Sequence, residues 1–451
     1  MTVVNDVHSR LNETTVDAVV PVDSLESIGA ALERARTTGR AVSIAGGRHA
    51  MGGQQFCEGG IVLDTRPLGG VVSIDETRGL VEVEAGIQWP TLVDALAHTP
   101  WAIRQKQTGA DDLCIGGAVS ANVHGRGLAY KPFVDDVESL VVVGPDGVAR
   151  TCSRTENADL FRLVCGGYGL FGVVHSATLR LDRRRKVERV VRLAHASELE
   201  ELFAERIADG YLYGDFQFAI DSASPDFLQR GICSCYRPVP DDTPLGPGHK
   251  LSAEVWSRLL HLAHHDKALA YDVYVKHYLA TDGQVYLSDR HQLATYVPGY
   301  HWDGSSEMIS ELYVPRPLLA DFLAAAARDL RALDANVVYG TVRLIERDEE
   351  SLLAWAREPW ACVVLNLHVE HTRAGVEAAA VAFRRLIDLA LERSGSFYLT
   401  YHRWATARQL LAAYPQLPAF LDAKRAHDPD GLFQSDWYRW LRDSVALEEA
   451  A

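Results

Sequence analysis

Three glycine-rich clusters carry the clearest chemical signal of this sequence. The first, at 45–55, reads AGGRHAMGGQQ and holds four glycines within eight residues. Glycine lets the backbone turn sharply and point successive N–H groups at one place, an arrangement that suits a pyrophosphate. A tight turn without any ligand would use the same glycines, so this cluster alone leaves both interpretations open.

Two further clusters follow, TGADDLCIGGAVSANVHGRG at 108–127 and CGGYGLFGVV at 165–174. Each brings small residues to a place where a large, flat ligand can lie against the backbone. The first cluster is not the G-x-G-x-x-G fingerprint followed by a helix and an acidic residue, so a nicotinamide Rossmann domain is disfavoured. Three such clusters, each bounded by predicted strands, indicate a large cofactor rather than three unrelated turns.

With these motifs, residues 1–185 and the C-terminal tail resemble the vanillyl-alcohol-oxidase superfamily of FAD enzymes, the PCMH-type FAD-binding oxidoreductases. GGRHA at 46–50 resembles the family's pyrophosphate loop, and the second cluster resembles the G-G-A-[IV]-x-x-x-[IV]-H-G stretch of decaprenylphosphoryl-ribose oxidases and sugar-lactone oxidases. YHRWA at 401–405 resembles the P-H-W-G-K box of lactone and alditol oxidases, and DPDGLFQSD at 428–436 resembles the segment that returns to the FAD domain.

The resemblance implies bound FAD. A histidine at the position of His49 carries an 8α covalent bond to the isoalloxazine ring in many relatives, while others lack it, and we predict this single attachment here. No second link through Cys114 is expected. The residues expected to contact FAD come from all three clusters: Gly46, Gly47, Arg48, His49, Ala50, Gln54, Thr108, Gly109, Cys114, Gly116, Gly117, Ser120, His124, Gly125, Gly172 and Val174.

The C-terminal box supplies the predicted acid–base chemistry. A flavin accepts a hydride at N5, so the protein must orient a C–H bond over that atom and manage one proton. His402 is the predicted base, and Tyr401 is the predicted proton relay or substrate ligand. A histidine satisfied inside the core is the structural alternative for His402.

Cations and a polar strand face complete the predicted catalytic set. Arg343 is the expected flavin-side cation, in a place where alditol oxidases have E-x-R, and Arg126 is expected to face the pocket. His368 shares one face of a predicted strand with Asn366 through the two-residue period, which is typical of a pocket wall. A surface arginine and a solvent-facing strand are the structural alternatives.

The elements that must position these residues predict an α+β protein. Strands are expected at 41–45, 61–63, 80–84, 138–143 and 172–181, and a helix with a capping box of Asp23 and Glu26 is expected to end at Gly39. We predict a PCMH-type FAD-binding domain of two subdomains at 1–185. A substrate-binding α+β cap domain, an antiparallel sheet flanked by helices, is predicted at 186–412, and 413–451 is predicted to return to the FAD domain.

Composition narrows the partners. The 451 residues include 60 acidic and 45 basic ones, a net charge of −15 that would repel nucleic acid and anionic lipid, so a small-molecule substrate is expected and those partners are not. No secretory signal or membrane-spanning run is visible, and seven scattered cysteines suit reduced thiols in the cytoplasm. His261 and His265 lack a third ligand at suitable spacing, so no metal site is predicted. The oligomeric state is left open.

Together these features predict an FAD-dependent oxidoreductase acting on CH–OH donors. It would transfer a hydride from a C–OH or C–NH carbon of a small or sugar-like substrate to flavin N5, and then pass the electrons to oxygen or another acceptor. One alternative is a carbon–carbon double-bond reductase of the sterol side-chain reductase type, whose members generally lack the histidine. A non-catalytic flavoprotein would place apolar residues at 343, 368 and 402. The aromatic segment 296–302 is expected to line the substrate mouth.

Overall fold

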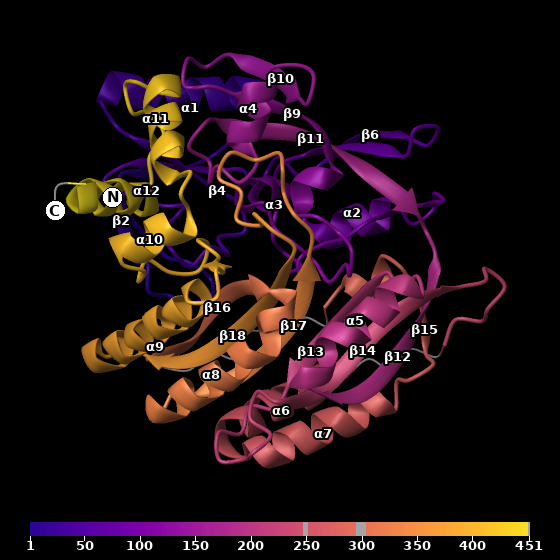
Figure 1. Ribbon diagram of the computed structural model, residues 1–451. Coiled ribbons are helices and arrows are strands. Elements are labelled where there is room, and N and C mark those ends of the chain that lie inside the picture. Colours follow the sequence, from indigo (N-terminus) through magenta and orange to yellow (C-terminus); the bar gives the residue numbers. More distant parts are fainter. Residues whose placement is uncertain (247–250, 295–303, 450–451) are drawn as a thin grey trace.

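The computed structural model describes residues 1–246, 251–294 and 304–449, and it mixes helices and strands along the whole chain (Figure 1). The expectation of a mixed helix-and-sheet fold is confirmed. Within the described part of the chain, no helix is long and apolar enough to cross a membrane.

The N-terminal residues form a short hairpin and a small parallel sheet. Strands β1 (Thr2–Val4) and β2 (Thr14–Val16) pair antiparallel. Strands β3 (Ala18–Pro21), β5 (Ile61–Asp64) and β4 (Val42–Ala45) lie side by side in that order and run parallel. The first glycine cluster therefore starts where β4 ends.

Helix α1 (Leu25–Thr38) connects β3 to β4 and packs its apolar face on this sheet. It ends at Gly39, as predicted, because this residue adopts a left-handed φ of +62° that glycine tolerates. The start of the helix differs from the prediction. Its capping box is formed by Ser24 and Ser27, since the Ser24 hydroxyl accepts from the Ser27 N–H, and the Asp23–Glu26 pair does not form it.

A second, antiparallel sheet carries the other two glycine clusters at its connections. Its strand order is β10-β9-β11-β7-β6, with β8 also paired to β11. Helix α3 follows the second cluster's turn and packs against β11. The elements are β6 (Val71–Asp75), β7 (Leu80–Glu84), α2 (Trp89–Ala95), β8 (Trp101–Ile103), α3 (Ile115–Ala121), β9 (Val137–Val143), β10 (Ala149–Ser153), α4 (Ala158–Val164) and β11 (Val173–Arg183).

A third, eight-stranded sheet is antiparallel throughout, in the order β15-β12-β14-β13-β17-β18-β16-β19. Its strands are β12 (Lys186–His195), β13 (Tyr213–Phe218), β14 (Arg230–Val239), β15 (Val285–Leu287), β16 (Ser305–Pro315), β17 (Val337–Ile345), β18 (Trp360–Glu370) and β19 (Ser396–Phe397).

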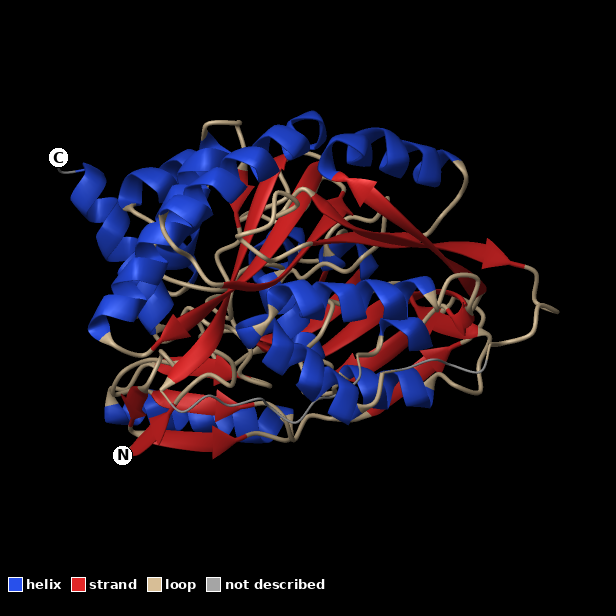
Figure 2. Cartoon of the chain, turned by 90° about the horizontal axis from the view of Figure 1, so that it is seen from below, coloured by secondary structure: helices blue, strands red, loops and turns tan. Residues whose placement is uncertain are grey.

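Helices cover both faces of this sheet. Figure 1 shows α5 (Leu199–Ala208), α8 (Leu319–Ala332) and α9 (Arg373–Leu391) in front of it, and Figure 2 shows helices on both sides. Helices α6 (Ala253–His265) and α7 (Lys267–Leu279) lie on the other face. Strand alternation explains this: Glu307 of β16 contacts α6, whereas Ser310, on the opposite face, bonds to His402, which stacks on Phe383 of α9.

The C-terminal segment lies against the parallel sheet. Helices α10 (Ala407–Ala413), α11 (Leu417–His427) and α12 (Asp436–Glu449) follow the last strand of the large sheet. Phe433 forms a parallel bridge with Val42 of β4, and the Asp436 N–H donates to the carbonyl of Phe56. The two chain ends thus meet beside the first glycine cluster, and the domain boundaries at 185 and 412 stay predictions.

Candidate active site

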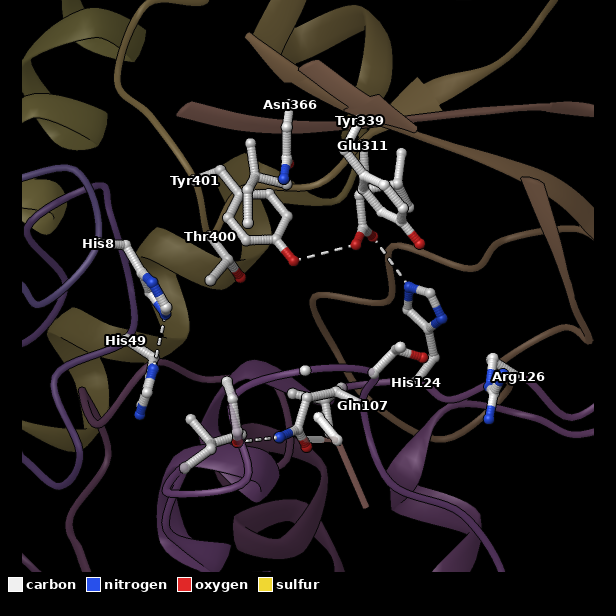
Figure 3. Close-up of a pocket in the computed structure, with 18 of the residues that line it drawn as sticks. His8, His49, Gln107, His124, Arg126, Glu311, Tyr339, Asn366, Thr400 and Tyr401 are labelled. Carbon is white, nitrogen blue, oxygen red and sulfur yellow. Dashed lines mark hydrogen bonds and ion pairs between the residues drawn. The ribbon is translucent and has the colours of Figure 1, made fainter. Parts of the chain in front are cut away.

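A cavity of about 730 Å³ lies between the glycine clusters and the pocket-facing side of the large sheet. This volume is within the range of small-molecule and cofactor sites, roughly 300–1,000 Å³. Figure 3 shows His49, Gln107 and His124 approaching from the N-terminal part of the chain, and Glu311, Asn366 and Tyr401 approaching from the opposite wall. The cavity therefore joins segments that are far apart in the sequence.

Hydrogen bonds tie the first glycine cluster to the C-terminal box. The Gln54 amide donates to the carbonyl of Leu399 at 2.8 Å, and the Met51 N–H donates to the carbonyl of Thr400 at 3.1 Å. Because Tyr401 follows directly, these bonds fix the position of its side chain above the loop.

Close approaches explain why glycines occupy this wall. A Cβ on Gly47 would lie 2.6 Å from the carbonyl oxygen of Asp112, and one on Gly116 would lie 2.9 Å from the Cβ of Ala85. Gly172 has a φ of +145°, and a Cβ there would lie 2.6 Å from a methyl group of Val142. The glycine segments therefore pack so tightly that side chains are excluded and backbone is left facing the cavity.

Several buried polar atoms on the cavity wall lack a partner within the described ranges. They include Arg48 Nε, Gln55 Oε1, Gln107 Oε1, Arg343 Nε and Asn366 Oδ1. Buried polar groups are normally hydrogen-bonded, so such atoms on one wall indicate a polar ligand. FAD, with its pyrophosphate, ribityl hydroxyls and ring heteroatoms, supplies matching donors and acceptors, and the residues present fit it.

The predicted FAD-contacting residues line this cavity with two exceptions, Cys114 and Gly125. Cys114 is buried behind the first loop, where its Sγ would lie 3.1 Å from a Cβ on Gly46, and burial raises the pKa of this thiol to about 11. Gly125 approaches the Lys106 carbonyl, from which a Cβ would be 2.7 Å away. Both support the loops from behind.

His49 lines the cavity and has a polar group near each ring nitrogen, although its Nε2 makes no hydrogen bond to the described residues. Its Nδ1 lies 2.7 Å from Nε2 of His8, and its Nε2 lies 3.2 Å from Oδ1 of Asp112. Burial, assisted by the neighbouring His49, lowers the pKa of His8 to about 4, so His8 is neutral at pH 7. A neutral His8 can donate its Nε2–H to His49, which leaves the lone pair on Nδ1 of His49 and the proton on the nitrogen that faces Asp112.

Glu311 of β16 is the centre of a buried hydrogen-bond network. Its Oε2 lies 2.9 Å from His124 Nε2 and accepts from the Tyr313 hydroxyl at 3.0 Å. Its Oε1 accepts from the Tyr401 hydroxyl, also at 3.0 Å (Figure 3). Glu311, His124 and Tyr401 all line the cavity, whereas Tyr313 does not.

The network holds Glu311 ionised. Burial alone would raise its pKa, but the charges of His124 and Arg343 and the hydrogen bonds from His124 and Tyr401 outweigh it and lower the pKa to about 2. His124 Nδ1 also lies 3.2 Å from the carbonyl oxygen of Gly125. The site thus contains an ionised, buried carboxylate in contact with an imidazole and a tyrosine hydroxyl.

Three of the predicted catalytic residues line the cavity: Tyr401, Arg343 and Arg126. Arg126 lies 3.7 Å from the Asp215 carboxylate, away from the Glu311 network. Asn366 also lines the cavity; on β18 it stands between Ile309 of β16 and Tyr339 of β17 in the strand register.

The other two predicted catalytic residues, His402 and His368, do not line the cavity. His402 packs against Phe383 and Trp404, with ring centroids 4.9 and 5.3 Å away, and its Nε2 lies 3.3 Å from the Ser310 hydroxyl. Burial lowers the pKa of His402 to about 3. His368 Nδ1 lies 3.1 Å from Glu307. The aromatic segment 296–302 lies outside the described residues.

Sequence reasoning missed Glu311 as a site residue. The available signal was a carboxylate within the largely apolar segment 308–314, a position where a charge needs a partner. His8 and Tyr339 carried no recognisable motif, and only folding brings them to the cavity.

Comparison with known protein families agrees with this geometry. Residues 16–153, which include the first two glycine clusters, match the family described as "FAD binding domain". The match covers the parallel sheet and most of the strands of the second sheet.

Individual relatives are oxidoreductases. The chain is 31% identical over 184 residues to an uncharacterised oxidoreductase of the fasciation locus of Rhodococcoides fascians, a match that spans 40% of each protein. It is 25% identical over 465 residues to decaprenylphosphoryl-β-D-ribose oxidase of Mycolicibacterium smegmatis, spanning 95% of each. With rice cytokinin dehydrogenase 4 it shares 28% identity over 220 residues, 44% of this chain and 40% of the relative.

The fold and the site thus define an FAD-binding flavoprotein. Residues 16–153 contain an FAD-binding domain, and the chain is similar to PCMH-type FAD-binding oxidoreductases, the resemblance that its motifs predicted.

Proposed function

We propose that this oxidoreductase takes a hydride from a C–OH or C–NH carbon of a small or sugar-like substrate and passes the electrons to oxygen or another acceptor. One observation carries the proposal: a single cavity joins the glycine loops to the ionised Glu311 and the Tyr401 hydroxyl. Bound FAD supplies the hydride acceptor, its N5 atom. The polar side chains on the strands would then bind the substrate and accept its proton.

The three clusters are the proposed FAD site. The backbone of 46–50 and 108–110 would hold the pyrophosphate, and the residues around Gly116 and Gly172 would pack on the flavin. In this proposal the parallel and antiparallel sheets are two subdomains of an FAD domain at 1–185, with a cap at 186–412 and a returning tail at 413–451.

His49 is the proposed site of an 8α attachment. Its Nδ1 carries the lone pair that such a bond requires once the hydrogen bond from His8 is released. A flavin that stays with the denatured polypeptide supports the attachment, and a colourless denatured protein contradicts it.

Tyr401 and Glu311 are the proposed proton pathway. A substrate hydroxyl that donates to the Tyr401 oxygen can lose its proton to Tyr401 as the tyrosine proton crosses the hydrogen bond to Glu311, in which the two oxygens are 3.0 Å apart. The network around Glu311 keeps this carboxylate ionised and therefore able to accept the proton. Arg343 of β17 and Arg126 of the second glycine cluster are proposed to stabilise negative charge in the cavity. His402 and His368, away from the cavity, have no place in this pathway.

The first experiment is anaerobic mixing of the flavoprotein with candidate alcohols and amines while the flavin absorbance is followed. Bleaching by an alcohol or amine supports the proposal. Rapid bleaching by NADPH with none by alcohols would support the double-bond reductase instead, and bleaching by neither class would support a binding protein.

A matched pair of variants tests the proton pathway. Tyr401→Phe and Tyr313→Phe each remove one hydroxyl that donates to Glu311 at 3.0 Å, but only Tyr401 lines the cavity. We expect Tyr401→Phe to lower kcat by about 10²–10⁴-fold, the usual contribution of acid–base catalysis, and Tyr313→Phe to have a much smaller effect. Equal effects of the two variants would refute the proposed role.

A further inference from the structure

A second cluster of ligating side chains lies at the far end of the same sheet face. His264, near the C-terminal end of α6, and His368 of β18 both point at Glu307 of β16. His264 Nε2 and His368 Nδ1 each lie 3.1 Å from the same oxygen, Oε1 of Glu307. Glu307 and His368 are direct cross-strand partners, and the two imidazole rings are 4.8 Å apart.

The spacing of these ligand atoms is close to that around a metal ion. Zinc–nitrogen and zinc–oxygen bonds of about 2.0–2.1 Å at tetrahedral angles place neighbouring ligand atoms roughly 3.3 Å apart. Two of the three separations in the cluster are 3.1 Å, and all three ligand atoms lie within 4.8 Å of one another. Small rotations of the imidazoles bring the third separation into range.

The carboxylate of Glu307 supplies a second observation. Its Oε2 atom is buried and has no hydrogen-bond partner in the described part of the chain, although Oε1 receives two. If the two histidines only formed hydrogen bonds to Glu307, each could bond to a different oxygen, and neither oxygen would then lack a partner. The second oxygen leaves the carboxylate able to take a further partner such as an ion.

The site is also open toward the ligand cavity. The His264 side chain is only 6% exposed, while Glu307, at 28%, lines the cavity. Three protein ligands with a remaining position that faces a cavity are typical of zinc sites that bind an exchangeable ligand. This differs from the cluster of His124, Glu311 and Cys362, where both Glu311 oxygens already accept hydrogen bonds.

We propose that His264, Glu307 and His368 bind a divalent ion of the Zn²⁺ class, with an open coordination position toward the cavity. The choice of ion follows from the donors. Two imidazole nitrogens and one carboxylate suit zinc and its neighbours, whereas Mg²⁺ and Ca²⁺ prefer oxygen ligands throughout. The sequence concealed the site because its ligands come from a helix and two strands, 104 residues apart from first to last.

The test measures zinc bound to the holoenzyme after incubation with Zn²⁺ and dialysis. We expect one equivalent in the unaltered protein, and a Kd for Zn²⁺ that rises by on the order of 100-fold or more in Glu307→Gln, His264→Ala and His368→Ala. The matched control is the double variant His261→Ala, His265→Ala, which removes an exposed histidine pair from the same helix, with rings 4.3 Å apart. It should retain the zinc.

Two results would overturn the proposal. One is an unaltered protein that binds no stoichiometric zinc, and the other is zinc lost from the His261, His265 double variant but kept in the Glu307 variant. If a triad variant does not fold, as judged by circular dichroism, the visible spectrum of Co²⁺ added to the unaltered protein decides. Intense bands of a low-coordinate site support the proposal, and the weak spectrum of hydrated Co²⁺ contradicts it.

Discussion

Replacing Glu311 by glutamine tests the buried carboxylate at the centre of the site. The pKa of this buried carboxyl falls from an ordinary 4.5 to about 2, which corresponds to about 3 kcal/mol of preferential stabilisation of the carboxylate in the folded protein. Glutamine keeps the size of the side chain but loses the charge that pairs with His124. We therefore expect Glu311→Gln to lower the free energy of unfolding by about 3 kcal/mol at pH 7.

The sign of the pH dependence is fixed by the direction of the shift. A depressed folded-state pKa stabilises the protein fully above the unfolded value of 4.5, and this stabilisation is lost as pH falls toward 2. The difference between the unaltered protein and the variant should therefore shrink to roughly half by about pH 3. Urea unfolding at a series of pH values, followed by fluorescence, measures it. A difference that is independent of pH, or absent at pH 7, would refute the assignment of Glu311 as an ionised, paired group.

Other substitutions test the cofactor loops and the discarded base. Gly47→Ala should lower FAD content, because its Cβ would lie 2.6 Å from a carbonyl oxygen, whereas Gly29→Ala on α1 meets nothing within 4 Å and should not; absorbance per polypeptide decides. His49→Ala should still bind FAD but release it on denaturation and oxidise substrate more slowly, so unchanged turnover would contradict its role. His402→Phe should keep kcat within about twofold, since His402 lies outside the cavity, and a loss like those of acid–base catalysis would restore it as the base. Because burial lowers the His402 pKa from 6.5 to about 3, this variant should also lose less stability than the unaltered protein as pH falls from 6.5 to 4.

Much of the fold was readable from local patterns. The strands at 42–45, 61–64 and 80–84 and the end of α1 at Gly39 lie where hydrophobic alternation and glycine placed them. The start of α1 did not follow its pattern, because Ser24 and Ser27 satisfy each other's backbone groups as well as an acidic capping box does. The two capping arrangements differ little in free energy, and contacts with neighbouring residues decide which one forms.

The catalytic side of the site shows the limit of sequence reasoning most clearly. Tyr401 and His402 are neighbours, and the motif gave no reason to separate them, yet one faces the cavity and the other stacks on Phe383 behind the sheet. The bonds of Gln54 and Met51 to residues 399 and 400 select this orientation. Neighbouring side chains point in opposite directions here, so the first lines the cavity and the second is packed in the core.

The sequence by itself indicated an FAD-binding protein, since the glycine loops are local structures that suit a large cofactor and their motifs resemble those of an FAD-binding family. Tertiary structure alone decided which side chains line the cavity. Glu311 becomes a strongly ionised group because His124, 187 residues earlier, and Tyr401, 90 residues later, close around it. Charge and burial depend on what folding brings within a few ångströms, and no spacing along the chain encodes that.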